Sequence, residues 1–226
     1  SIKDAIWYGR TIYHNILKFC KFQLVINVAA VVVSAIAPFF GVEEPLKVTH
    51  LLFVNLVMDG LGAIMLGNEP AREHYMSEKP RRRDESIVSR SMMTQIVTMG
   101  IWLTALSFVF LKLPFFDQFF ATTEQKLSAY FVLFIWAALF NGFNVRDEGF
   151  EIFKGLNENT GFLKVFLTII LVQAVIVNAG LIPGLDWIGS MFSCVPFGVT
   201  GWCVVAVLAV TMIPVDLIRK AAGKRA

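Results

Sequence analysis

Apolar residues dominate this chain in long stretches, and charged residues gather between them. A helix needs about 20 predominantly apolar residues to cross the hydrocarbon core of a bilayer, and six stretches approach this length. The pattern therefore predicts an all-α fold, a polytopic membrane helical bundle with six transmembrane helices. The predicted spans cover residues 21–40, 48–67, 92–113, 127–143, 162–182 and 197–217.

The segment before the first span continues the helical pattern. Residues 1–20 carry apolar positions at a loose helical spacing, without Pro or a Gly cluster, which predicts a cytoplasmic stalk helix. Pro38 is expected to end the first span, and the last span is expected to stop at Pro214-Val215-Asp216 before a short basic tail. We expect residues 1–226 to form a single transmembrane domain.

Composition and charge agree with a membrane protein. Hydrophobic residues make up 56% of the chain and charged residues 16%, whereas soluble domains carry about a quarter charged residues. Cytoplasmic loops retain Lys and Arg. If both termini and the second and fourth loops are cytoplasmic, only Lys47, Lys112 and Lys126 of the 20 basic residues lie on the other side. The sequence therefore predicts that both termini are cytoplasmic, with Arg81-Arg82-Arg83 as a topology anchor at the headgroups.

Asn55 and Asp59 are the chemical centre of the second span, in which Asp59 is the only formal charge. An ionised carboxylate in hydrocarbon is costly, so such residues usually face the bundle interior and serve ions or protons. A spacing of four residues puts both side chains on one helical face, and carboxylate and amide oxygens suit hard cations. The pair predicts a metal-ion site. The alternative is a polar pair that only holds helices together.

Asn27, about two turns into the first span, offers a third amide oxygen. An amide at this depth commonly hydrogen-bonds a neighbouring helix instead, and for Asn27 alone both interpretations stay open. Gln23 and Ser34 are further polar residues of the same span, and no role is assigned to them.

Three glycines, Gly60, Gly62 and Gly67, follow Asp59 closely. They predict either local unwinding that frees backbone carbonyls beside the ligands or close packing of helices through small residues. Both can hold. Four more polar residues lie in or near the later spans. Asn141 and Asn144 are expected to line a cavity or cap a helix, and Gln173 and Asn178 to make interhelical or interfacial contacts.

Several short segments are recognisable by their order. They are Gly9-Arg10-Thr11-Ile12-Tyr13, Gln23-Leu24-Val25-Ile26-Asn27-Val28, Val54-Asn55-Leu56-Val57-Met58-Asp59, Glu69-Pro70 and Ser89-Arg90-Ser91-Met92-Met93. Together they resemble the C-terminal transmembrane half of a P-type calcium-transporting ATPase of the plasma-membrane-type subfamily. The resemblance implies that the six spans are the fifth to tenth helices of such a pump and that Asn27, Asn55 and Asp59 are metal ligands.

Departures from the two-ion pumps of this family bear on stoichiometry. Ala30 and Ala138 stand where those pumps carry acidic ligands, and Met58 stands where they carry Thr. The resemblance to the single-ion type implies one calcium site.

The resemblance also implies parts that these residues do not include: the actuator, phosphorylation and nucleotide-binding domains and the first four helices. We therefore expect the chain to be excised from a larger pump, with Mg-ATP bound only in those domains and with no catalytic or cofactor-binding residue here. The expected partners are the lipid bilayer and Ca2+, with protons as counter-ion and no nucleic acid. The expected location is the plasma membrane. The alternatives are a non-catalytic helical membrane scaffold or interaction domain and, ranked last, an autonomous channel or carrier.

Overall fold

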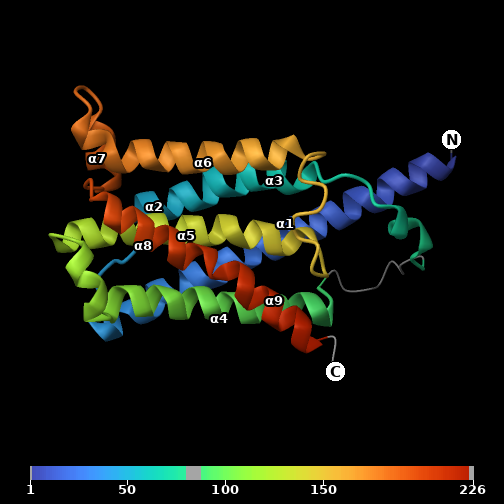
Figure 1. Cartoon of the computed structure of the whole chain (residues 1–226), viewed down its shortest axis with the longest axis horizontal. Helices are drawn as coiled ribbons and strands as arrows, with labels where there is room; N and C mark the ends of the chain where they lie inside the picture. The colour runs from blue at the N-terminus through green and yellow to red at the C-terminus, as the bar shows by residue number, and fades with distance from the viewer. Residues whose placement is uncertain (1, 80–87, 224–226) are drawn as a thin grey trace.

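The computed structural model describes residues 2–79 and 88–223, and in this part of the chain every regular element is helical (Figure 1). The elements are α1 (Ile2–Ile36), η1 (Ala37–Phe40), α2 (Val48–Phe53), η2 (Val54–Met58), α3 (Asp59–Gly67), η3 (Glu73–Ser77), α4 (Arg90–Lys112), η4 (Pro114–Phe119), α5 (Thr123–Arg146), α6 (Thr160–Asn178), η5 (Ala179–Leu181), α7 (Asp186–Phe192), α8 (Val199–Val210) and α9 (Met212–Gly223).

Six helical segments are long and apolar enough to cross a membrane, which confirms the predicted fold class. They are Ile2–Phe40, Val48–Gly67, Arg90–Lys112, Thr123–Arg146, Thr160–Leu181 and Val199–Gly223. The start of α1 and the end of α9 lie at the same end of the bundle (Figure 1), as an even number of crossings requires. Assignment of that end to the cytoplasm stays a prediction from charge. The Arg81-Arg82-Arg83 run lies outside the described residues.

The helix ends follow local sequence signals. Side chains of Ser89, Thr122 and Asn159 accept hydrogen bonds from backbone N–H groups three residues later, which caps α4, α5 and α6. Pro38 opens the short η1 turn after α1, and Gly41 ends that turn with φ of 70°, a conformation that favours glycine. The first 20 residues continue α1 without a break, as their pattern predicts.

The last span differs from its prediction, because the helix does not stop at Pro214. The helix is interrupted at Thr211 instead: α8 ends at Val210, and α9 runs from Met212 to Gly223. Pro214 therefore lies in the first turn of α9, where the missing N–H costs no helical hydrogen bond.

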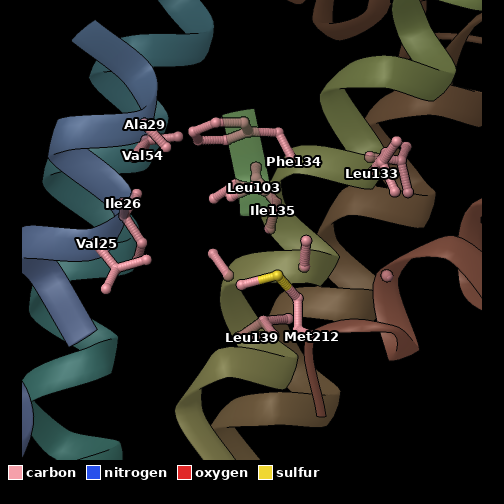
Figure 2. Packing of buried hydrophobic residues seen from close by; sticks show 14 of the residues in the cluster. Val25, Ile26, Ala29, Val54, Leu103, Leu133, Phe134, Ile135, Leu139 and Met212 are labelled. Carbon is pink, nitrogen blue, oxygen red and sulfur yellow. The ribbon is translucent and has the colours of Figure 1, made fainter. Parts of the chain in front are cut away.

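The α5 helix forms the centre of the bundle. Of the residues in its most apolar 18-residue stretch, 89% are buried, against 50% or less in the corresponding stretches of the other spans. It packs against α1, α4, α6, α8 and α9. Figure 2 shows Phe134 and Leu139 of α5 between Val25 and Ile26 of α1 on one side and Met212 of α9 on the other. Burial of such side chains is worth roughly 1.5–3 kcal/mol each in soluble proteins, whereas in lipid the gain comes mainly from close packing.

Two charged residues, Glu69 after α3 and Arg146 at the end of α5, are buried. The side chains of Glu69 and Arg146 are both 0% exposed, and Arg146 Nε donates to Glu69 Oε1 at 2.7 Å. Lys18 Nζ lies 3.5 Å from the other Glu69 oxygen, and Asn159 donates to Oε1 at 2.7 Å. These contacts join segments far apart in the sequence and hold the ends of α3, α5 and α6 together.

Candidate cation site

The three predicted ligands line one groove between α1 and the helix that α2, η2 and α3 form. Asn27, Asn55 and Asp59 contribute to its wall together with Ser34 and Leu51, and its volume is about 680 Å³. Asn27 and Asp59 are half-buried, and Asn55 is exposed in the groove. Asn27 precedes Asn55 by 28 positions and Asp59 by 32, yet all three side chains line the same groove. Oxygen atoms from two helices therefore face a shared space.

The backbone beside this groove is irregular. Residues Val54–Met58 form a π-helical segment, after which α3 begins at Asp59. A π segment inserts an extra residue into a turn and is frequent at functional sites. The glycine-rich part that follows stays helical, so the irregularity precedes Asp59 and does not lie in the glycines.

Close packing explains Gly62. A Cβ atom at this position would lie 2.8 Å from Cε1 of Phe22 in α1, closer than real Cβ contacts. Of the two predicted roles of the glycines, close packing is therefore confirmed at Gly62. The absence of a side chain brings α3 against α1 at the level of Asp59.

Asp59 has a neutral partner. Gln23 Nε2 donates a hydrogen bond to Asp59 Oδ2 at 2.9 Å, and among the described residues no Lys or Arg pairs with this carboxylate. The nearest cations along α1 are engaged elsewhere, Lys18 with Glu69 and Lys21 with Glu148. The negative charge of Asp59 therefore remains available to a cation.

Two polar residues near the ligands had no role in the sequence analysis: Ser34 lines the groove, and Gln23 contacts Asp59 beside it. Gln23 precedes Asn27 by four residues and Ser34 follows it by seven, so helical spacing places all three on one face of α1. The buried Ser34 hydroxyl has no hydrogen-bond partner within the described residues. The helical spacing that singled out Asn55 and Asp59 could also have grouped Gln23 and Ser34 with Asn27.

The remaining polar candidates lie away from the groove. Asn141 and Asn144 are fully buried, and Asn144 donates to the carbonyl oxygen of Met212 in α9 at 2.8 Å. Gln173 donates to the carbonyl oxygen of Phe131, which confirms its interhelical role. Asn178 instead donates to the carbonyl oxygen of Ala174 in its own helix, and an interfacial contact stays a prediction for this residue.

The chemistry of the groove is that of oxygen ligands. Its wall offers two amides, one hydroxyl and one carboxylate, a donor set suited to hard cations such as Ca2+. Within residues 2–79 and 88–223, no group of three or more His, Cys, Asp or Glu side chains is arranged to hold a metal ion. The groove therefore supplies only part of a coordination shell, since Ca2+ takes six to eight oxygens.

Comparison with known families bears on what this arrangement serves. Residues 43–222 match the family described as "Cation transporting ATPase, C-terminus". The chain belongs to this family. The match includes Asn55 and Asp59, whereas Asn27 precedes it. As a cation-transporting ATPase C-terminal region, the chain is a six-helix membrane domain whose groove lies between its first two spans.

Curated relatives agree with the resemblance to the plasma-membrane subfamily. The chain is 31% identical over 219 residues to plasma membrane calcium-transporting ATPase mca-1 of Caenorhabditis elegans, which covers 92% of this chain. It is 32% identical over 213 residues, or 89% of the chain, to plasma membrane calcium-transporting ATPase 3 of Homo sapiens. It is 34% identical over 179 residues, or 79% of the chain, to calcium-transporting ATPase 12, plasma membrane-type, of Arabidopsis thaliana. The chain spans 17% of the length of each of these relatives.

Proposed function

We propose that this chain is the ion-binding transmembrane part of an ATP-driven calcium pump of the plasma membrane, with its spans as the fifth to tenth helices. The observation that carries the proposal is the groove in which Asn27, Asn55 and Asp59 converge while the carboxylate keeps its charge free of Lys and Arg. The relatives named as plasma membrane calcium-transporting ATPases support calcium as the ion and the plasma membrane as the location.

The site takes one calcium ion in this proposal. Ala30 lines the groove with a methyl group only, and Ala138 is buried in α5 and is not among the groove residues. Neither position offers an oxygen for a second ion. Asp59 and the two amides carry four side-chain oxygens at most, and Ca2+ takes six to eight, so water, backbone carbonyls or another segment of the pump must complete the shell.

The size of the groove supports a further contribution from outside this chain. The groove measures about 680 Å³ and is open to the surface at the exposed Asn55, so the ligands of this chain do not enclose an ion by themselves. The fourth helix that the resemblance implies would fill the remaining space. The catalytic domains that bind Mg-ATP would then act on the site through α1, and protons would return as counter-ions when calcium leaves.

The test is ATP-driven uptake of radioactive calcium by the full-length pump that carries this chain, reconstituted in liposomes. Asp59→Asn removes the charge at nearly unchanged volume and is expected to lower uptake to the background level. Asn55→Ala is expected to raise the calcium concentration for half-maximal uptake at least tenfold, because a ligand is lost.

Asn178→Ala is the matched control, since it removes an amide near the end of α6 whose hydrogen bond runs to Ala174 in the same helix. Its uptake should equal that of the parent. Normal calcium uptake by folded Asp59→Asn would contradict the proposal and favour the scaffold, in which polar residues serve packing alone.

A further inference from the structure

The contact between Gln23 and Asp59 joins α1 to α3 beside the groove. Gln23 Nε2 lies 2.9 Å from Asp59 Oδ2, and within the described residues this is the one hydrogen bond that the carboxylate receives. Gln23 is itself half-buried. One carboxylate oxygen is therefore held on α1, while Oδ1 has no such partner.

A neutral donor has a specific consequence here. A Lys or Arg at this place would neutralise Asp59 and compete with an incoming cation, whereas an amide N–H orients the carboxylate and leaves its full charge. Hydrogen bonds to charged groups are also among the stronger ones in proteins. Gln23 thus has the properties of a group that fixes a ligand without replacing the ion.

We propose that Gln23 is a positioning residue of the cation site: it holds Asp59 Oδ2 so that Oδ1 points to the ion. This inference rests on the proposed function and deepens it. Gln23 does not line the groove among the residues that form its wall, so it acts through Asp59 and not as a ligand.

The packing around this contact keeps the two helices at the required distance. Phe22, the neighbour of Gln23, is fully buried against Gly62 of α3. Because Gly62 has no side chain, α1 and α3 approach closely three residues after Asp59. Whether the Gln23 amide reaches Asp59 therefore depends on this close approach of the two helices as well as on the length of the Gln23 side chain.

The experiment measures calcium uptake by the full-length pump in liposomes as a function of calcium concentration. Gln23→Met keeps the length of the side chain and removes the donor. We expect the half-saturating calcium concentration to rise roughly tenfold, with a maximal rate within about twofold of the parent. Gln23→Asn keeps the amide group but shortens the side chain by one methylene. It should also raise the half-saturating calcium concentration, although the side chain stays polar.

The matched control is Gln173→Met. Gln173 is fully buried and donates across helices to Phe131 at 3.1 Å, but away from the groove. This variant should lower the melting temperature and leave half-saturation unchanged. If Gln23→Met and Gln23→Asn also lower only the melting temperature, Gln23 merely connects two helices and the inference is overturned.

Asp59→Asn separates this inference from the proposed function. If Asp59→Asn abolishes uptake while both Gln23 variants keep the parental half-saturation, only the positioning role fails. If Asp59→Asn transports normally, the cation site itself fails, and the Gln23 inference fails with it.

Discussion

The carboxylate of Glu69 illustrates how a single residue can join several helices. It receives Arg146 and Asn159 on one oxygen and faces Lys18 on the other, and its side chain is fully buried. Removing one partner of a buried ion pair leaves an uncompensated charge, which typically costs 3–5 kcal/mol. The strength of this contact therefore depends on all members being present.

Glu69→Gln tests this dependence. Arg146 and Lys18 would keep their positive charges without an anion, so we expect a loss of roughly 3–5 kcal/mol in stability, measured as the melting temperature of the purified protein. The matched change Glu151→Gln removes a carboxylate from an exposed pair with Lys154 and should have an effect near zero. Equal melting temperatures for the two variants would contradict the assigned role of Glu69.

The pair of Arg72 and Asp147 predicts a pH dependence. Burial of Asp147 disfavours its charge, but Arg72 at 2.6 Å and the N–H groups of Gly149 and Glu151 outweigh this and hold the pKa below its ordinary value of 3.8. A lowered folded-state pKa contributes stability above the unfolded value that is lost as pH falls through the folded one. Arg72→Leu should therefore lower the melting temperature at pH 7, and the difference from the parent should shrink below about pH 4.

At the scale of elements, the spacing of α1 and α3 decides the geometry of the groove. It depends on Gly62, where a Cβ would meet the ring of Phe22 at 2.8 Å. The ring is fully buried, so it has little room to yield. Added volume in a well-packed contact commonly costs 1–3 kcal/mol.

Gly62→Ala is thus expected to push the helices apart and to weaken calcium binding several-fold in the reconstituted pump. Phe22→Leu in the same protein should restore much of the loss, because the smaller side chain leaves room for the new methyl group. Gly60→Ala serves as the control, since a Cβ there meets nothing within 4 Å. An unchanged affinity in Gly62→Ala would show that the spacing tolerates the extra atom.

The positions of the helices could be predicted from the sequence, but the irregularities within them could not. Lengths of apolar stretches located all six spans, since hydrocarbon thickness sets helix length. The π segment before Asp59 and the break at Thr211 escaped prediction, because both depend on packing against other helices. The contact between Glu69 and Arg146 escaped prediction for the same reason. They lie 77 positions apart, and only the fold shows that each neutralises the other.

For the whole molecule, the distribution of charge predicts which end faces the cytoplasm. Glu43 lies in the turn after η1 and Glu158 in the loop between α5 and α6, and both are exposed. In cells expressing a variant without Cys20, Cys194 and Cys203, a membrane-impermeant maleimide should label Glu43→Cys directly. Glu158→Cys should react only after permeabilisation, and the reverse pattern would overturn the predicted orientation.

The groove residues could be predicted from the sequence because one charge in an apolar span is rare and helical spacing relates it to its neighbours. Asn27, Asn55 and Asp59 do line one space. The partner of Asp59 could not be predicted, since Gln23 lies on another helix and its distance from Asp59 depends on the packing of Phe22 against Gly62. Spacing along one helix is visible in sequence, whereas distance between helices is not.

The unbroken α1 helix has a mechanical consequence. Its 35 residues extend roughly 52 Å, whereas the hydrocarbon core is about 30 Å thick, so some 20 Å projects beyond it. Residues 72–79 are fastened to the projecting part, where Trp7 and Arg10 donate to carbonyl oxygens of Arg72, Tyr75 and Glu78. If α1 pivots at mid-membrane, a tilt of about 10° moves its first residues by roughly 6 Å. Asn27 lies close to the pivot and shifts far less. A large movement of the projecting part of α1 would therefore produce a small displacement of Asn27, exerted with greater force.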